Sequence, residues 1–223
     1  MRTAKTVLTV IQERGKQKKP IERVYKLLFN RELYLNAYAK LYPNNGAMTK
    51  GVTDETVDGM SIQKIDRMIE ILREEKYQWK PARREYIKKK NGKKRPLGIP
   101  VWGDKVLQEV MRQILEAYYE PQFSEPSHGF RPNRGCHTAL QEIQVWKGTR
   151  WFIEGDISQY FDTIDHKILL EILARNIHDG RFIRLVSNML EAGYLEEWKF
   201  NQTISGVPQG GVISPIPVSY THL

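Results

Sequence analysis

One stretch near the middle of the chain constrains the fold more than any other. Residues 151–162 read Trp-Phe-Ile-Glu-Gly-Asp-Ile-Ser-Gln-Tyr-Phe-Asp, an apolar and aromatic run that ends in acids beside a turn. Such runs, bounded by turn residues, are typical of buried or half-buried strands. We therefore expect residues 151–157 to form a strand of a sheet, with Asp156 at the mouth of that sheet.

A carboxylate at that position is suited to a hard cation such as Mg²⁺. In phosphoryl transfer, such a metal orients the attacking oxygen and neutralises developing charge. The alternative is structural, because Asp162 or Asp165 can cap a following helix and Asp156 can be a turn residue. The stretch alone leaves both interpretations open.

The charge balance indicates a polyanionic partner. The 223 residues include 35 Lys and Arg against 26 Asp and Glu, a net charge of +9. The longest apolar runs are too short for a membrane span or a signal peptide, so we expect an intracellular, cytoplasmic protein without membrane contact. The single cysteine, Cys136, excludes an internal disulfide and fits a reducing compartment. We expect its side chain to be a small, buried hydrophobe.

Apolar spacing predicts helices along most of the remaining chain. Residues 20–41 are predicted to form one long helix or two short ones, and residues 43–60 a loop rich in glycine and Asx residues. Residues 198–200 are predicted to be a short strand. Further helices are expected over residues 62–72 (capped by Ser61), 103–120, 137–146, 164–172 and 182–190.

Residues 80–95 carry the strongest charge signal. An Asn91-Gly92 pair lies between two short runs, which is a strong signal for a β-hairpin. Lysines on an edge strand also deter aggregation, so a solvated edge is the alternative. The imbalance favours phosphate binding. Against one acid, Glu85, the segment holds Lys80, Arg83, Arg84, Lys88, Lys89, Lys90, Lys93, Lys94 and Arg95.

Two further segments are weaker candidates. Residues 127–135 place Arg131 and Arg134 among turn residues, where they can contact a nucleic-acid backbone or pair with acids at the edge of the core. Residues 206–211 form a glycine-rich turn, which by itself is weak evidence for a phosphate or nucleotide loop.

Taken in order, these segments resemble the reverse transcriptase domain of group II intron-encoded proteins, the reverse transcriptase/maturases. The resemblance covers roughly residues 20–215. Another retroelement or a diversity-generating reverse transcriptase fits less well, because of the first block and of Thr163-Ile164-Asp165-His166. The similar blocks are residues 45–59, 83–100, 127–132, 155–166 and 208–215.

The resemblance implies an α+β fold, the fingers and partial palm of a right-hand polymerase, with helices packed on an antiparallel sheet. It divides the chain into an N-terminal helical extension (1–50), fingers (51–150), a partial palm (151–215) and an atypical tail (216–223), expected to reflect truncation or read-through. It also implies RNA-directed DNA polymerisation and assistance to intron splicing. The partners implied are group II intron RNA, an RNA template, a DNA primer and deoxynucleoside triphosphates.

Site residues follow from the same resemblance. Asp156 is the implied catalytic residue, and it would hold Mg²⁺ together with the Ile157 carbonyl. Phe161 would lie under the sugar of the nucleotide and exclude a 2′-hydroxyl. The triphosphate is assigned to Lys89 and Arg95, and the nucleotide pocket near the primer end to Gln209. Contacts to RNA are assigned to Lys88, Lys90, Lys93, Lys94, Arg131 and Arg134.

The chain departs from the family pattern in three places. Lys88 stands where the family usually has proline, and Ser158-Gln159 replace a pair that is often basic. The family's later Tyr-Ala-Asp-Asp motif has no counterpart, since no adjacent aspartates follow Asp156. We therefore expect an incomplete N-terminal portion that is inactive on its own. The rival interpretation is a non-catalytic fragment that binds RNA through residues 1–20 and 80–95.

Overall fold

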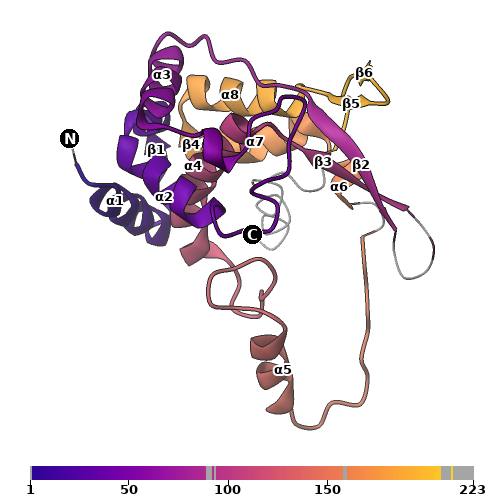
Figure 1. Cartoon of the computed structure of the whole chain (residues 1–223). Coiled ribbons are helices and arrows are strands. Elements are labelled where there is room, and N and C mark those ends of the chain that lie inside the picture. The colour runs from indigo at the N-terminus through magenta and orange to yellow at the C-terminus, as the bar shows by residue number, and fades with distance from the viewer. Residues whose placement is uncertain (1, 89–91, 93, 158–159, 207–211, 213–223) are drawn as a thin grey trace.

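The computed structural model describes residues 2–88, 92, 94–157, 160–206 and 212. These residues form helices around one central helix, together with two sheets (Figure 1), which is the α+β class that the sequence predicts. The elements are α1 (Ala4–Lys16), β1 (Ile21–Glu22), the 3₁₀ helix η1 (Val24–Phe29), α2 (Arg31–Leu41), η2 (Val57–Gly59), α3 (Ile62–Arg73), β2 (Ala82–Lys88), β3 (Lys94–Ile99), α4 (Trp102–Tyr119), η3 (Glu120–Gln122), α5 (Cys136–Gln144), α6 (Tyr160–Thr163), α7 (His166–Asn176), β4 (Ile177–His178), α8 (Gly180–Leu190), β5 (Tyr194–Glu196) and β6 (Lys199–Asn201).

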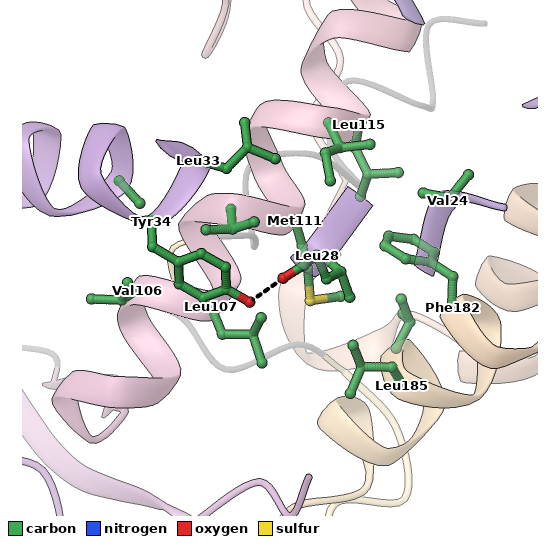
Figure 2. Packing of buried hydrophobic residues seen from close by; sticks show 14 of the residues in the cluster. Val24, Leu28, Leu33, Tyr34, Val106, Leu107, Met111, Leu115, Phe182 and Leu185 are labelled. Carbon is green, nitrogen blue, oxygen red and sulfur yellow. Dashed lines mark hydrogen bonds between the residues drawn. The ribbon is translucent and has the colours of Figure 1, made fainter. Parts of the chain in front are cut away.

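Helix α4 lies at the centre of the hydrophobic core. It is buried along nearly its whole length, and its buried residues include the polar or charged Asp104, Lys105, Gln108 and Glu109 beside apolar ones. Side chains of η1, α2 and α8 meet it (Figure 2). The buried phenol of Tyr34 is satisfied because its hydroxyl donates to the Leu28 carbonyl at 2.7 Å (Figure 2). Gly15 lets α1 approach α4 closely, since a Cβ there would lie 2.0 Å from the Tyr118 carbonyl oxygen.

The predicted helices are confirmed to within a few residues, and side-chain caps define where several of them begin. Ser61 accepts a hydrogen bond from the Lys64 N–H at 3.2 Å at the start of α3. Asp165 accepts one from the Ile168 N–H at 3.0 Å at the start of α7, which is the structural role considered for this acid. The confirmed elements are α3, α4, α5, α7 and α8.

The prediction for residues 20–41 is right only in its second half. Helix α2 is present, but the first half holds β1 and the 3₁₀ helix η1. Ile21 is buried and pairs in parallel with Ile177 of β4, so a distant segment overrides the local helical spacing. Arg23 then adopts a left-handed conformation (φ 55°), which breaks any continuous helix.

The basic hairpin is confirmed. Strands β2 and β3 pair antiparallel from Arg83 opposite Ile99 to Lys88 opposite Lys94. Gly92 has φ 77°, a conformation that glycine adopts without strain, while Asn91 lies outside the described residues.

The sheet that contains this hairpin differs from the antiparallel sheet that was expected. Its strand order is β3-β2-β5-β6, and β2 pairs in parallel with β5, so the sheet is mixed rather than wholly antiparallel. Among the described residues, five α-helices (α4 to α8) and the 3₁₀ helix η3 lie between β2 and β5 in the chain, and such a long connection permits parallel pairing. The predicted strand at residues 198–200 corresponds to β6.

The strand predicted for residues 151–157 is wrong. These residues are extended and exposed, with Trp151 at 88% and Ile153 at 93% of full exposure, and they pair with no strand in the part of the chain that the structure describes. A strand needs partners for its backbone N–H and C=O groups, and exposed backbone can leave those groups to solvent instead.

The segment before it, α5, projects from the main body (Figure 1) and contributes no buried residue. Cys136 opens this helix and is exposed, so the expectation of a buried thiol is also wrong.

Candidate nucleic-acid interface

A pocket of about 400 Å³ lies where the base of the basic hairpin meets α6 and residues 202–206. The hairpin contributes Arg84, Pro96 and Gly98, and α6 contributes Phe161 and Asp162. The remaining lining residues are Tyr194 of β5 and residues 202–206. Phe161, the residue expected to lie under a nucleotide sugar, thus shares a pocket with the hairpin.

Hydrogen bonds fix the position of Phe161 relative to residues 202–206. The Gly206 N–H donates to the Ile164 carbonyl at 2.8 Å, and the Ser205 hydroxyl donates to the Asp162 carbonyl at 3.3 Å. The Gly206 carbonyl lies 2.7 Å from His166 Nε2. Gly206 itself has φ 86°, and a Cβ there would lie 2.7 Å from the Phe161 carbonyl oxygen, so only glycine fits this close approach.

Arg84 and Tyr194 line the same pocket as Phe161. The Arg84 guanidinium carbon lies 3.5 Å from the centroid of the Tyr194 ring, a cation–π contact between β2 and β5. The Arg84 Nε is buried without a hydrogen-bond partner among the described residues. Next along the strand, the Tyr86 hydroxyl donates to Glu196, and this hydrogen bond raises the pKa of Tyr86. These contacts hold the hairpin against β5.

Strand register separates the cations of the hairpin onto two faces. Residues opposite each other in an antiparallel pair share a face, and alternate residues along a strand do too. Lys88 and Lys94 are paired, exposed, and on the face of Arg84 that lines the pocket. Arg95 pairs with Ile87 and is exposed on the other face. The structure therefore does not bring Arg95 and Phe161 into one pocket.

The other predicted residues of the hairpin and the nucleotide pocket cannot be placed in this way. Lys89, Lys90, Lys93 and Gln209 lie outside the described residues.

Asp156 and Ile157 lie on the exposed, extended segment 151–157. A carboxylate and a backbone carbonyl are the ligand types that Mg²⁺ prefers. However, no cluster of three or more His, Cys, Asp or Glu side chains that could hold a metal occurs in residues 2–206 where these are described. The described donor set is therefore chemically suitable but incomplete for a metal site.

Arg131 is engaged inside the protein. Its guanidinium donates to the Glu120 carboxylate at 2.8 Å and to the carbonyls of Ser124 and Ser127 at 2.8 and 2.9 Å. Only 6% of the side chain is exposed. The structure thus shows the pairing with an acid that was the alternative for this residue. Arg134 donates to the Glu125 carbonyl in the same loop.

Sequence reasoning missed Arg84, Tyr194 and Glu196 as parts of the site. Arg84 was visible only as one of many cations, although strand alternation places it with Tyr86 and Lys88 on one face. The partners on β5 could not be foreseen, because nothing local to the sequence indicates that β5 pairs with β2.

None of the described helices is both long enough and apolar enough to cross a membrane.

Comparison with known proteins places these features in a family. Residues 87–221 match the model of the family described as reverse transcriptase (RNA-dependent DNA polymerase). The chain is similar to the group II intron-encoded protein LtrA of Lactococcus lactis subsp. cremoris, with 49% identity over 203 residues that cover 90% of the chain and 34% of LtrA. An uncharacterized 91 kDa protein in a cob intron of Schizosaccharomyces pombe is 46% identical over 228 residues, which cover 98% of the chain and 28% of that protein. Nuclear intron maturase 1, mitochondrial, of Arabidopsis thaliana is 36% identical over 93 residues, which cover 41% of the chain and 13% of that protein.

The chain therefore spans about a third or less of the length of these curated relatives. The family match extends over more than half of the chain, from within β2 through the Phe161 pocket and beyond. The matched range contains the blocks at residues 127–132, 155–166 and 208–215 and most of the block at residues 83–100, but not the block at residues 45–59. The chain belongs to the reverse transcriptase family and is similar to proteins encoded by group II introns.

Proposed function

We propose that this chain supplies the fingers (51–150) and part of the palm (151–215) of an RNA-directed DNA polymerase that also assists the splicing of its intron RNA. The observation that carries the proposal is the pocket that is lined by both Phe161 and the base of a cationic hairpin. A polymerase needs such a juxtaposition, because the sugar and the phosphates of one nucleotide must be held at the same time. The N-terminal helical extension (1–50) is proposed as part of the RNA-binding surface, and a reducing, cytoplasmic setting as the location.

The proposed reaction is in-line attack of a primer 3′-hydroxyl on the α-phosphate of a deoxynucleoside triphosphate, with pyrophosphate as the leaving group. Phe161 is proposed to exclude a 2′-hydroxyl by its volume, and Gln209 to line the pocket near the primer end. Lys89 and Arg95 are proposed to hold the triphosphate through charge-assisted hydrogen bonds. Arg95, on the face of the hairpin away from the Phe161 pocket, could do so only if the hairpin turned relative to α6. Asp156 and the Ile157 carbonyl are proposed ligands of Mg²⁺, which would supply charge neutralisation at the phosphate.

The proposed RNA contacts of the hairpin are the exposed side chains of Lys88 and Lys94, together with Lys90 and Lys93. Arg134 is a further proposed contact. Arg131 could act only by leaving its bonds to Glu120, or indirectly by fixing the shape of its loop. Such contacts give affinity without sequence preference.

The test uses a polypeptide extended to the length of a relative such as LtrA. We expect templated, Mg²⁺-dependent primer extension by this polypeptide and its loss in Asp156→Ala, while RNA binding stays within about twofold. Losing a metal ligand removes several kcal/mol of transition-state stabilisation, so activity should fall by about a thousandfold or more. Unchanged extension by Asp156→Ala would refute the assignment of Asp156.

A second candidate concerns the 223-residue polypeptide itself, which we propose binds RNA without polymerising. The observation in its favour is that Asp156 belongs to no group of three or more His, Cys, Asp or Glu side chains that could hold a metal among the described residues. Two-metal catalysis needs more than one carboxylate to clamp the attacking and leaving oxygens. Primer extension with the purified 223-residue polypeptide decides this point, since templated synthesis would contradict it.

A further inference from the structure

A second cavity, of about 470 Å³, lies between η2, α3 and the start of α4. It shares no lining residue with the Phe161 pocket. Its volume falls within the range of roughly 300–1,000 Å³ that is common for ligand pockets. None of the roles proposed above uses it.

The wall of this cavity is mainly apolar. It includes Met60, Met68, Ile71, Tyr77 and Trp102. Methionine side chains adapt to the shape of a ligand, and aromatic rings stack on flat, conjugated groups. Such a wall suits a planar, partly apolar ligand such as a nucleobase.

A buried carboxylate fixes part of this wall. Asp104 is 2% exposed and accepts hydrogen bonds from the Tyr77 hydroxyl at 2.6 Å and from the Lys80 N–H at 3.0 Å. The Tyr77 ring also packs edge-on against Trp79, with 5.2 Å between ring centroids. Both contacts hold the Tyr77 ring in a defined orientation, so this side of the cavity is preformed. Gly103 leaves room for the Met68 side chain, whose Cε would lie 3.4 Å from a Cβ at that position.

The rim of the cavity is basic. Lys64 pairs with Glu55 at 3.2 Å, and Lys76 pairs with Glu74 at 3.0 Å. Both ion pairs are solvent-exposed, so each contributes little to the stability of the fold. Each lysine can therefore exchange its carboxylate partner for a phosphate at little cost in free energy. The basic side chains that line the cavity are Lys64, Arg67, Lys76 and Lys80, against the two acids Glu55 and Asp104.

We propose that this cavity holds one unpaired nucleobase of an RNA strand, with the adjoining phosphates on the basic rim. The inference rests on the RNA partner proposed above but concerns a separate site. The apolar wall alone would also accept an apolar side chain of a protein, but four exposed cations among the lining residues favour a polyanion. A base held in a duplex cannot enter, so the site selects single-stranded or bulged RNA.

Methionine methyl groups provide a direct readout of the cavity. The chain has six methionines, of which Met60 and Met68 line the cavity and Met111 is fully buried in the core. The 223-residue polypeptide, labelled with ¹³C at the methionine methyls, is titrated with a short oligouridylate and, separately, with an RNA duplex of similar length. We expect the single strand, but not the duplex, to shift the Met60 and Met68 signals and to leave Met111 unchanged.

A matched pair of glycine variants tests occupancy of the cavity. Gly59 lines the cavity, and a Cβ there meets no atom closer than Lys64 Nζ at 3.8 Å, so Gly59→Phe can fill the space without a backbone clash. Gly46 lies in the preceding loop, outside the cavity, and also has room for a side chain. We expect Gly59→Phe to weaken single-stranded RNA binding about tenfold, the scale of losing one stacked base, and Gly46→Phe to leave it unchanged. Gly59→Ala, with equal thermal stability to the wild type, controls for folding.

The outcomes separate this inference from the proposed function. RNA binding with unshifted Met60 and Met68 signals would overturn the cavity site and leave the RNA partner standing. No RNA binding at low salt would overturn both. Equal shifts with single strand and duplex, or an equal loss of affinity in Gly59→Phe and Gly46→Phe, would also overturn the assignment to an unpaired base.

Discussion

Replacing Asp179 by alanine should destabilise the fold far more than removing an ordinary helix cap. Asp179 caps α8 by accepting a hydrogen bond from the Arg181 N–H at 3.2 Å, and its other oxygen accepts one from the buried Tyr25 N–H at 2.9 Å. The residue is buried (8% exposed), and its hydrogen bonds tie the segment around η1 to the start of α8, 154 positions further along the chain.

The expected loss of folding free energy in Asp179→Ala follows from these two hydrogen bonds. Loss of the cap costs about 1 kcal/mol. Leaving the Tyr25 N–H buried without an acceptor costs about 1–3 kcal/mol more. The expected total of about 2–4 kcal/mol lowers the melting temperature by about 5–15 °C for a chain of this size. Asp179→Asn keeps one carbonyl acceptor and should give an intermediate loss.

Asp165 is the matched control. It caps α7 through the Ile168 N–H at 3.0 Å but is exposed and has no second, buried backbone donor among the contacts of the described residues. Asp165→Ala should therefore cost only about 1 kcal/mol. The measurement is urea unfolding of each variant followed by circular dichroism, at fixed pH and salt. Equal losses for Asp179→Ala and Asp165→Ala would refute the argument from the Tyr25 N–H.

Three further predictions address pH dependence, the sugar and RNA. Burial raises the pKa of Asp104 from 3.8 to about 6, so the folded state binds the Asp104 proton more tightly than the unfolded state does. The contribution of Asp104 to the free energy of unfolding is therefore full below about pH 4 and should fall by about 2–3 kcal/mol by pH 6. Asp104→Asn should lack this fall in urea unfolding at a series of pH values, and an identical pH profile would contradict the assignment. In the extended polypeptide, Phe161→Val should raise ribonucleotide relative to deoxyribonucleotide incorporation, measured in competition, because the ring volume that excludes a 2′-hydroxyl is reduced; an unaltered sugar preference would count against the pocket assignment. RNA binding by the 223-residue polypeptide should weaken with salt: the logarithm of the binding constant should fall against the logarithm of salt concentration with a slope of about −0.7 per neutralised phosphate. The Lys88→Ala/Lys94→Ala double variant should make that slope less negative by about one unit. Salt-independent binding would speak against the hairpin as the RNA contact.

The sequence by itself determined the elements whose signals are local. Apolar residues at helical spacing specified α3, α4, α7 and α8, and Ser61 and Asp165 marked two helix starts, because a cap is formed within one turn of chain. The Asn-Gly pair between two short runs specified the hairpin for the same reason. The ordered blocks also indicated the family, because each block is a short run of residues that can be compared without knowledge of the surrounding fold.

Only the tertiary structure decided features that depend on distant partners. Pairing of Ile21 with Ile177 replaced the start of a predicted helix, and pairing of β2 with β5 made the sheet mixed. The apolar run at residues 151–157 has the composition of a strand but pairs with none in the described chain, because a strand is completed by its neighbours rather than by its own sequence. The candidate site also has one part that residue types predicted and another that only the fold decided. Residue types predicted the cationic hairpin and Phe161, whereas the fold set Arg84 against Tyr194, Arg131 against Glu120, and Arg95 on the face away from the pocket.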